Sequence, residues 1–174
     1  MLRGAHVTLV NASVSVEPPM FVDVVSVTSA ADMADVGKSK AAEQDIIIMT
    51  AAVADFCPSH PADEKIKKND SSYESVIELE RTEDILSYLG AHKTKGQLIC
   101  GFSMETQNML ENSKAKLAKK NADMIVANNL KVAGAGFGTD TNVVTLITAD
   151  DCTELEIMDK SCVASRIMDR LLQM

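Results

Sequence analysis

A chain of 174 residues, 46% hydrophobic and 24% charged, has the composition of an ordinary soluble protein and suits a single domain, residues 1–174. Its formal net charge of −8 argues against general binding to nucleic acid or to a membrane surface, and no apolar run approaches the roughly 20 residues of a membrane span. The four cysteines and three histidines lack the spacing of a zinc site or a disulfide framework, so we expect reduced thiols in a cytoplasmic protein.

Short apolar strands alternate with helices along most of the chain. In chain order the pattern predicts strands at 6–11 and 23–28, a helix at 29–44, a strand at 45–50, a helix at 82–92, a strand at 97–103, a helix at 106–121, a strand at 123–128, a hairpin at 142–148 and 154–158, and a last helix at 161–173. Ser29 and Thr82 are the predicted N-caps of the first two helices. The strands are mostly apolar throughout, which is typical of a parallel sheet covered on both faces. The fold class is therefore α/β: a Rossmann-like, doubly wound, mostly parallel sheet with a C-terminal β-hairpin and a final helix.

The first residues do not match the start of such a fold. Met1–Gly4 has the pattern of a helix end, whereas a doubly wound fold begins with a strand and a phosphate-facing turn. That first strand lies in the middle of the sheet, so its neighbours would be left with unpaired edges. We therefore expect the domain to be incomplete at its N-terminus or to be completed by another chain.

Small or polar residues follow the predicted strands, at Asn11, Thr50, Ser103 and Asn128. Ligands of open α/β sheets bind outside the carboxyl ends of the strands. The pattern therefore places residues 51–55, residues 102–105 and Asn128 along the rim of one crevice.

Two lysine clusters accompany this rim, one at Lys65, Lys67 and Lys68 and the other at Lys116 and Lys120 on one helix face. A lone lysine face is more often a solvated surface, which is the alternative for the helix. Two clusters near one sheet edge of an acidic protein favour a ligand with several phosphate charges.

Other residues near the rim allow two interpretations each. Asp55 is either a turn residue or a ligand for Mg²⁺ or for a hydroxyl or amine group. Glu105 is a first-turn helix charge or part of the site, and Phe102 is a core aromatic or a ring that flanks a nucleotide base. The glycine-rich run at 134–138 lacks the G-x-G-x-x-G spacing and precedes a strand, so it is a weak phosphate-loop signal.

Five stretches together resemble the phosphopantothenate–cysteine ligase family, also called phosphopantothenoylcysteine synthetase. They are AAVADF at 51–56, EKIKK at 64–68, GFSMET at 101–106, AKLAKKNADMIVANN at 115–129 and GFGTDTN at 136–142, in family order and spacing. The resemblance implies a ligase of coenzyme A biosynthesis. Its bacterial type uses CTP and Mg²⁺ to convert 4′-phosphopantothenate into an acyl-cytidylate, which the amine of cysteine attacks. The resemblance further implies a homodimer and a flavin-dependent decarboxylase as a partner.

The resemblance also implies roles for individual residues. Lys65 and Asp55 would serve catalysis, with Asp55 at the metal. The residues implied to bind CTP are Ala51, Ala52, Asp55, Lys65, Glu83, Asp84, Ile85, Leu86, Phe102, Lys116 and Lys120. Residues 83–86 would act through backbone N–H groups, and the segment after Lys65 resembles a mobile flap that excludes water.

The family's glycine-rich first turn and its Asn-Arg-Ser-Ser-Gly stretch have no counterpart in this sequence. The resemblance therefore implies that CTP binds but that ligation by these 174 residues alone is weak or absent. Two alternatives stay open. One is a Rossmann-type oxidoreductase that binds NAD(P), and the other is a non-catalytic fragment of the ligase.

Overall fold

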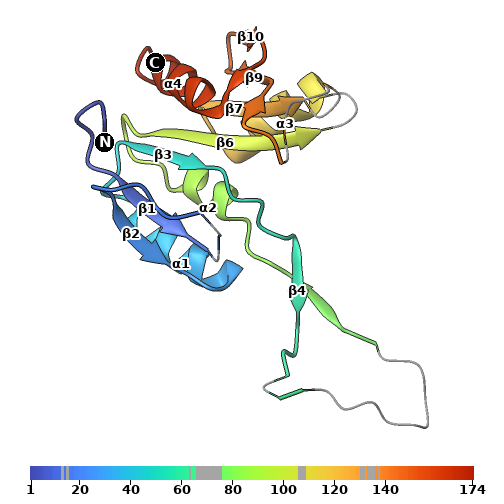
Figure 1. Ribbon diagram of the computed structural model, residues 1–174. Helices are drawn as coiled ribbons and strands as arrows, with labels where there is room; N and C mark the ends of the chain where they lie inside the picture. Colours follow the sequence, from blue (N-terminus) through green and yellow to red (C-terminus); the bar gives the residue numbers. More distant parts are fainter. Residues whose placement is uncertain are drawn as a thin grey trace. The chain divides into compact units, whose positions relative to one another are not determined.

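The computed structural model describes residues 1–12, 14, 16–62, 64–65, 76–105, 109–129, 132, 136 and 138–174. The chain divides into two compact units (Figure 1). The first consists of Met1–Val36 and Ala52–Asp84, and the second of Gly37–Ala51 and Ile85–Met174. No helix within the described ranges is both long enough and apolar enough to cross a bilayer.

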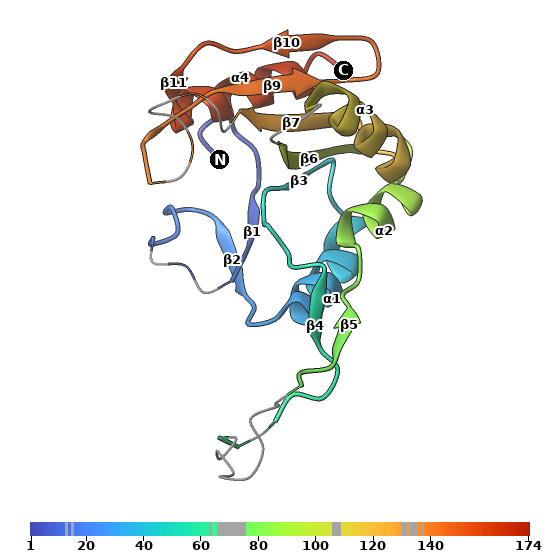
Figure 2. The same ribbon diagram turned by 90° about the vertical axis from the view of Figure 1, so that its right-hand side faces the viewer.

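The second unit is built on a five-stranded sheet with the order β10-β9-β7-β6-β3, which can be followed in Figure 2. Its strands are β3 (Ile46–Met49), β6 (Leu98–Glu105), β7 (Met124–Asn129), β9 (Val144–Ile147) and β10 (Cys152–Glu154). Strands β3, β6 and β7 run parallel, whereas β9 pairs antiparallel with both β7 and β10. The predicted parallel sheet and C-terminal hairpin are confirmed, but the bounds of the second hairpin strand are wrong. The strand is Cys152–Glu154, which shares only Glu154 with the predicted 154–158, and Met158 pairs with another strand.

Helices cover both faces of this sheet. The final helix α4 (Lys160–Leu171) buries Val163, Ile167 and Leu171 at a spacing of four, as expected for an amphipathic helix. These three pack in one core cluster with Cys100, Met124, Val126, Val144 and Leu146. The opposite face receives α2 (Ile85–Ala91) and α3 (Met109–Lys120), and Figure 2 shows α3 and α4 on different sides of the strands.

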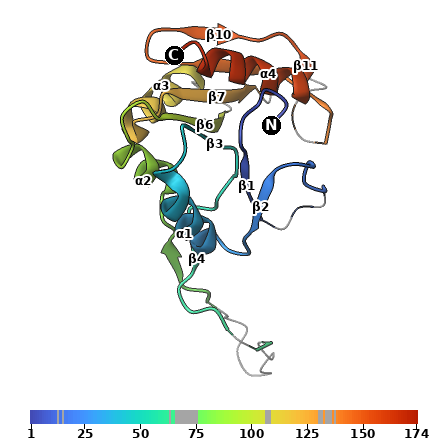
Figure 3. The same ribbon diagram turned by 90° about the vertical axis from the view of Figure 1, so that its left-hand side faces the viewer.

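The first unit contains two small sheets, which Figure 3 shows from another side. Strands β1 (Thr8–Asn11) and β2 (Asp23–Ser26) pair in parallel, and β4 (Phe56–Pro58) and β5 (Leu79–Arg81) form an antiparallel ribbon. We expected β1 and β2 as part of one continuous sheet, and the structure instead gives them a two-stranded sheet of their own. A further pair, β8 (Thr141–Asn142) with β11 (Met158–Asp159), belongs to the second unit.

The predicted cap of α1 (Ala30–Ala41) is confirmed, and that of α2 is wrong. Ser29 accepts the Asp32 backbone N–H at 3.1 Å, while the Asp32 carboxylate accepts the Ser29 N–H at 2.9 Å. Hydrogen bonds from Thr28 and Ser29 lower the pKa of Asp32 to about 2. Thr82 does not cap α2, which begins three residues later, because its N–H and hydroxyl bind the carbonyls of Asp55 and Ala54.

The predicted helix end at Met1–Gly4 is a turn. Its Gly4 N–H donates to the Met1 carbonyl at 2.9 Å, and Gly4 has a φ of +84°, in the left-handed region that glycine tolerates. The four cysteines are free thiols, as expected. Burial raises the pKa of Cys100 to about 12, so this thiol is an inert part of the core.

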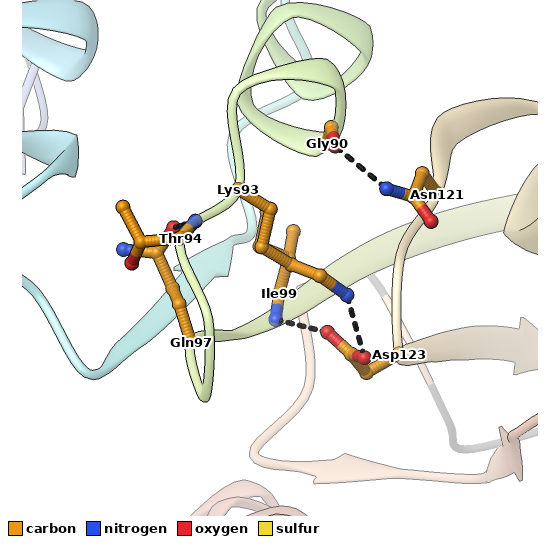
Figure 4. Close-up of polar contacts among 7 residues, drawn as sticks. All are labelled: Gly90, Lys93, Thr94, Gln97, Ile99, Asn121 and Asp123. Carbon is orange, nitrogen blue, oxygen red and sulfur yellow. Dashed lines mark hydrogen bonds and ion pairs between the residues drawn. The ribbon is translucent and has the colours of Figure 1, made fainter.

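A group of polar contacts holds the amino ends of the strands in the second unit (Figure 4). We call it the amino-end clamp. The Asp123 carboxylate accepts hydrogen bonds from the Lys93 ammonium at 2.8 Å and from the Ile99 N–H at 2.7 Å. The Gln97 amide donates to the carbonyls of Ala41 at 2.6 Å and Gln44 at 2.5 Å. These contacts join β6 to β7 and to the segment before β3, and none was predicted from the sequence.

Candidate functional site

Strand β6 extends beyond its neighbour β3 at the carboxyl edge of the sheet. The last pair between them joins Met49 to Gly101, whereas β6 continues beside β7 as far as the pair between Glu105 and Asn129. The backbone of Phe102 therefore lies past the end of β3. This register confirms that residues 102–105 and Asn128 share one edge of the sheet, whereas the placement of residues 51–55 along the same rim stays a prediction.

Lys116 is held at this edge. Its ammonium donates a hydrogen bond of 2.9 Å to the carbonyl of Phe102, the first β6 residue beyond the last pair with β3. An ammonium has three N–H donors, so the one hydrogen bond that Lys116 makes to the described residues leaves two for an anion. Lys120 ends α3 one turn later, and its backbone carbonyl lies beside Gly90 of α2. The structure thus brings Lys116 to the edge and places the backbone of Lys120 farther along α3.

Four polar side chains link the elements around this edge. The hydroxyls of Ser103 in β6 and Ser113 in α3 lie 2.9 Å apart. Asn128 of β7 donates to the Ser103 carbonyl at 3.2 Å and accepts from the Asn142 amide at 2.8 Å. We did not foresee these links, because a serine within a helix carries no distinctive signal, although Asn142 closes the stretch GFGTDTN.

Three candidates take part in the core of the second unit. The ring of Phe102 is half-buried and packs against the α4 side of the core, which favours the interpretation as a core aromatic. Ile85 and Leu86 are only 5% and 6% exposed, and Leu86 contacts the backbone at Gly101. Their side chains are therefore unavailable to a ligand, and only their backbone could serve one.

The remaining candidates are exposed residues. Ala52, Asp55, Lys65, Glu83 and Asp84 belong to the first unit, and Ala51 belongs to the second. The Asp55 carbonyl accepts the Thr82 N–H at 3.0 Å, which fixes the backbone just before β4 and leaves the carboxylate exposed. Thr82 was not among the predicted site residues.

Several predicted features lie outside the described residues. They are Lys67, Lys68, the segment after Lys65 that resembles a flap, and most of the glycine-rich run. The side chain of Glu105 is likewise not described. The predictions made for them stay predictions.

The described residues offer few ligands for Mg²⁺. Within the described ranges, no three His, Cys, Asp or Glu side chains gather into a group that could hold a metal ion. Asp55 offers one exposed carboxylate. Mg²⁺ is commonly bound by one or two carboxylates together with substrate phosphates, so Asp55 fits this ion only alongside a nucleotide.

The family model for the DNA/pantothenate metabolism flavoprotein C-terminal domain matches residues 1–174. The chain belongs to this family. The resemblance inferred from the five sequence stretches is therefore confirmed at the level of the family. The match spans both units, so the family assignment covers the exposed candidates of the first unit and the strand edge of the second.

Curated relatives in this family are longer proteins. The coenzyme A biosynthesis bifunctional protein CoaBC of Bacillus subtilis is 45% identical over 170 residues, which are 97% of this chain and 41% of the relative. A protein named cysteine/cysteine sulfinic acid decarboxylase, from an unknown prokaryotic organism, is 44% identical over 171 residues, 97% of this chain and 47% of the relative. The chain thus spans less than half the length of these relatives.

Solved structures share the fold of this chain. The C-terminal domain of a CoaBC protein matches with a TM-score of 0.81 and 40% identity, covering 99% of this chain and 77% of that chain. The DNA/pantothenate metabolism flavoprotein from Streptococcus pneumoniae matches with a TM-score of 0.79 at 17% identity, covering 99% and 82%, which is a likeness of fold. A Cab2 variant in complex with phosphopantothenate-cysteine matches with a TM-score of 0.63 at 16% identity, covering 88% and 54%.

Proposed function

We propose that this chain is the ligase part of a coenzyme A biosynthesis enzyme, which joins 4′-phosphopantothenate to cysteine by way of an acyl-cytidylate formed from CTP. The observation that carries the proposal is the family match over all 174 residues, supported by 40% identity to the solved C-terminal domain of CoaBC. The family's description as a flavoprotein domain and the relative named as a decarboxylase support a flavin-dependent decarboxylase as the partner activity. The free cysteines fit the proposed cytoplasmic location.

The proposed chemistry has two steps. A carboxylate oxygen of phosphopantothenate attacks the α-phosphorus of CTP and pyrophosphate leaves. The cysteine amine then attacks the acyl carbon, CMP leaves, an amide forms and the amine gives up a proton. Charge builds on phosphate oxygens in the first step, and cations lower its barrier. Mg²⁺ bound with the nucleotide phosphates would supply part of that charge.

Chain residues have proposed roles in this scheme. Lys116 supplies its two remaining N–H donors to phosphate, and Lys65 and Lys120 add positive charge. Asp55 binds Mg²⁺ together with the nucleotide. The half-buried Phe102 offers the exposed part of its ring to the base. The backbone of residues 83–86 and the small residues Ala51 and Ala52 complete the proposed nucleotide contacts.

Nucleotide selectivity tests the function. CTP with Mg²⁺ should raise the midpoint of thermal unfolding more than ATP with Mg²⁺, and NADPH should have no effect. Equal shifts from CTP and ATP would remove the base preference from the proposal. A shift from NADPH alone would favour the oxidoreductase alternative, and no shift from any triphosphate would contradict the ligase.

Two lysine substitutions should weaken CTP binding, measured by titration calorimetry. Lys65→Ala and Lys116→Ala each remove a proposed phosphate contact worth about 1.5–3 kcal/mol, so each dissociation constant should rise about tenfold or more. Lys114→Ala is the matched control, because Lys114 is exposed on α3 and points to a different helix face from Lys116. Equal affinities for all three variants would show that the two assignments are wrong.

The proposed homodimer forms through the β4–β5 ribbon. Each of its strands has only three residues, and a two-stranded ribbon of this size is marginal by itself. Large apolar side chains on and beside it are exposed: Phe56 by 49%, Leu79 by 59%, Ile77 by 68% and Val76 by 83%. A second copy of the ribbon would extend the sheet and cover these side chains.

Leu79→Glu should therefore convert the dimer to a monomer, measured by light scattering after size-exclusion chromatography. The reason is that a carboxylate in the dimer interface would lose its water without gaining a partner. Leu172→Glu is the control, since Leu172 is 64% exposed and lies at the end of α4. A dimer that survives Leu79→Glu, or a wild-type monomer, would contradict the proposed interface.

A further inference from the structure

The hydroxyl pair of Ser103 and Ser113 is an unusual contact between a strand and a helix. Ser103 is 4% exposed and Ser113 is fully buried, and their oxygens lie 2.9 Å apart. Serines inside helices commonly turn back to the carbonyl four residues earlier. The hydroxyl of Ser113 instead meets a side chain of β6, so this bond sets how α3 sits on the sheet.

The helix α3 could not shift along β6 or rotate without breaking this bond. Either motion would leave two hydroxyl groups buried away from water, which proteins strongly avoid. Apolar residues of similar size would fill the same space but would accept several registers, since apolar packing is not directional. The hydroxyl pair therefore selects one register of the helix.

That register determines where the Lys116 ammonium lies. Ser113 and Lys116 are three residues apart on α3 and so share a helix face. Lys116 then reaches the Phe102 carbonyl at 2.9 Å, and Phe102 directly precedes Ser103 in β6. Two successive residues of the strand are thus bound by two residues of the helix, one turn apart.

Ser103 is also held from the other side of the strand. Asn128 donates to its carbonyl at 3.2 Å, and Asn142 donates to the Asn128 side chain at 2.8 Å. The strand end to which α3 is attached is consequently fixed to β7 and β8. A helix fixed to a mobile strand end could not hold a lysine in place, whereas this one can.

We propose that Ser103 and Ser113 are positioning residues for the nucleotide site, whose hydroxyl pair fixes α3 against β6 and thereby places the Lys116 ammonium for a phosphate group. This inference rests on the proposed function, because the phosphate is that of the triphosphate substrate. It assigns a role to two buried serines that act through Lys116.

The test is the double variant Ser103→Ala, Ser113→Ala, titrated with CTP and Mg²⁺. Because both hydroxyls are removed together, no buried hydroxyl is left without its partner. Alanine is also a good helix former at position 113, so the unfolding midpoint should change little. The dissociation constant should nevertheless rise roughly tenfold, the loss expected when one charge-assisted hydrogen bond is misplaced. Ser161→Ala, on the exposed surface of α4, should bind as the wild type does.

The same substitutions in a Lys116 variant separate an effect on the position of Lys116 from a general loss of structure. In Lys116→Gln, the same double substitution should weaken binding no further, because the lysine through which it acts is gone. Ser113→Cys replaces the hydroxyl by a thiol, which is a weak donor, and should also weaken CTP binding. This variant replaces the double variant in the test if the double variant does not fold.

The outcomes are distinguishable. Wild-type affinity in the double variant would overturn the inference and leave the proposed function intact. An equal loss in the Lys116→Gln background would also overturn it, because the serines would then act by another route. A wild-type protein that binds no nucleoside triphosphate would overturn the proposed function, and this inference with it.

Discussion

Gly90→Ala is expected to destabilise the protein by about 3 kcal/mol or more. A Cβ atom at this position would lie 1.8 Å from the Lys120 carbonyl oxygen and 2.9 Å from the carbon of the same group. Both are backbone atoms at the end of α3, so no side-chain rotation can relieve the overlap. The helices α2 and α3 would have to separate, and the 2.7 Å hydrogen bond from Asn121 to the Gly90 carbonyl would break.

Gly37→Ala is the matched control for this substitution. Gly37 lies inside α1, and its nearest neighbour would be the Ile85 Cγ2 atom at 3.7 Å, an ordinary contact. Alanine should therefore stabilise by up to about 1 kcal/mol through helix propensity alone. Urea unfolding followed by circular dichroism measures both changes. Similar stabilities for the two variants would show that α2 and α3 are not packed as described.

Asp123→Ala is expected to cost about 2–4 kcal/mol, because it removes the acceptor at the centre of the amino-end clamp. The Ile99 N–H and the Lys93 ammonium would both lose their partner, and the side chains of Lys93 and Asp123 are only 20% and 19% exposed. Asp123→Asn keeps an oxygen for the Ile99 N–H, but it loses the charge and the second oxygen, which accepts from the Lys93 ammonium. Its cost should be less than half that of the alanine variant.

Urea unfolding also measures these two variants, with Asp35→Ala as the control. Asp35 is an exposed aspartate inside α1, where alanine should change the free energy of unfolding by less than about 0.5 kcal/mol. If Asp123→Ala were as mild as the control, the clamp would be a surface contact of little consequence. Equal costs for Asp123→Asn and Asp123→Ala would assign the stability to the ion pair alone.

The sequence predicted the parts of the fold that leave a long, regular pattern. The strands β3, β6 and β7 were found because their apolar runs are nearly continuous, and α4 because its apolar residues recur every four positions. The ribbon β4–β5 was missed, since strands of three residues are too short to show alternation. The separate pairing of β1 with β2 depends on which strand edges meet, which no local pattern encodes.

The sequence predicted some of the positions of the candidate residues and missed the contacts that hold them. The position of Lys116 at the strand edge followed from helix spacing and from the family motif. The sequence could not predict that the ring of Phe102 packs against the core. A side chain at a strand end can point to either face of the sheet, and the positions of the helices decide which face is covered. Thr82 and the hydroxyl pair depend on contacts between distant segments, such as the bond from Thr82 to the Asp55 carbonyl.

The unequal lengths of β3 and β6 have a consequence for anyone who engineers this domain. The four residues of β3 stop at Met49, so the last part of β6 has lost one lateral neighbour and depends on side chains for support. Libraries that test the proposed nucleotide site can therefore vary the tip of β6 without disturbing the amino-end clamp. They should retain Lys116 and Asn128, because each of these supports a carbonyl of that tip, and also Ser103 and Ser113, whose hydroxyls join the tip to α3.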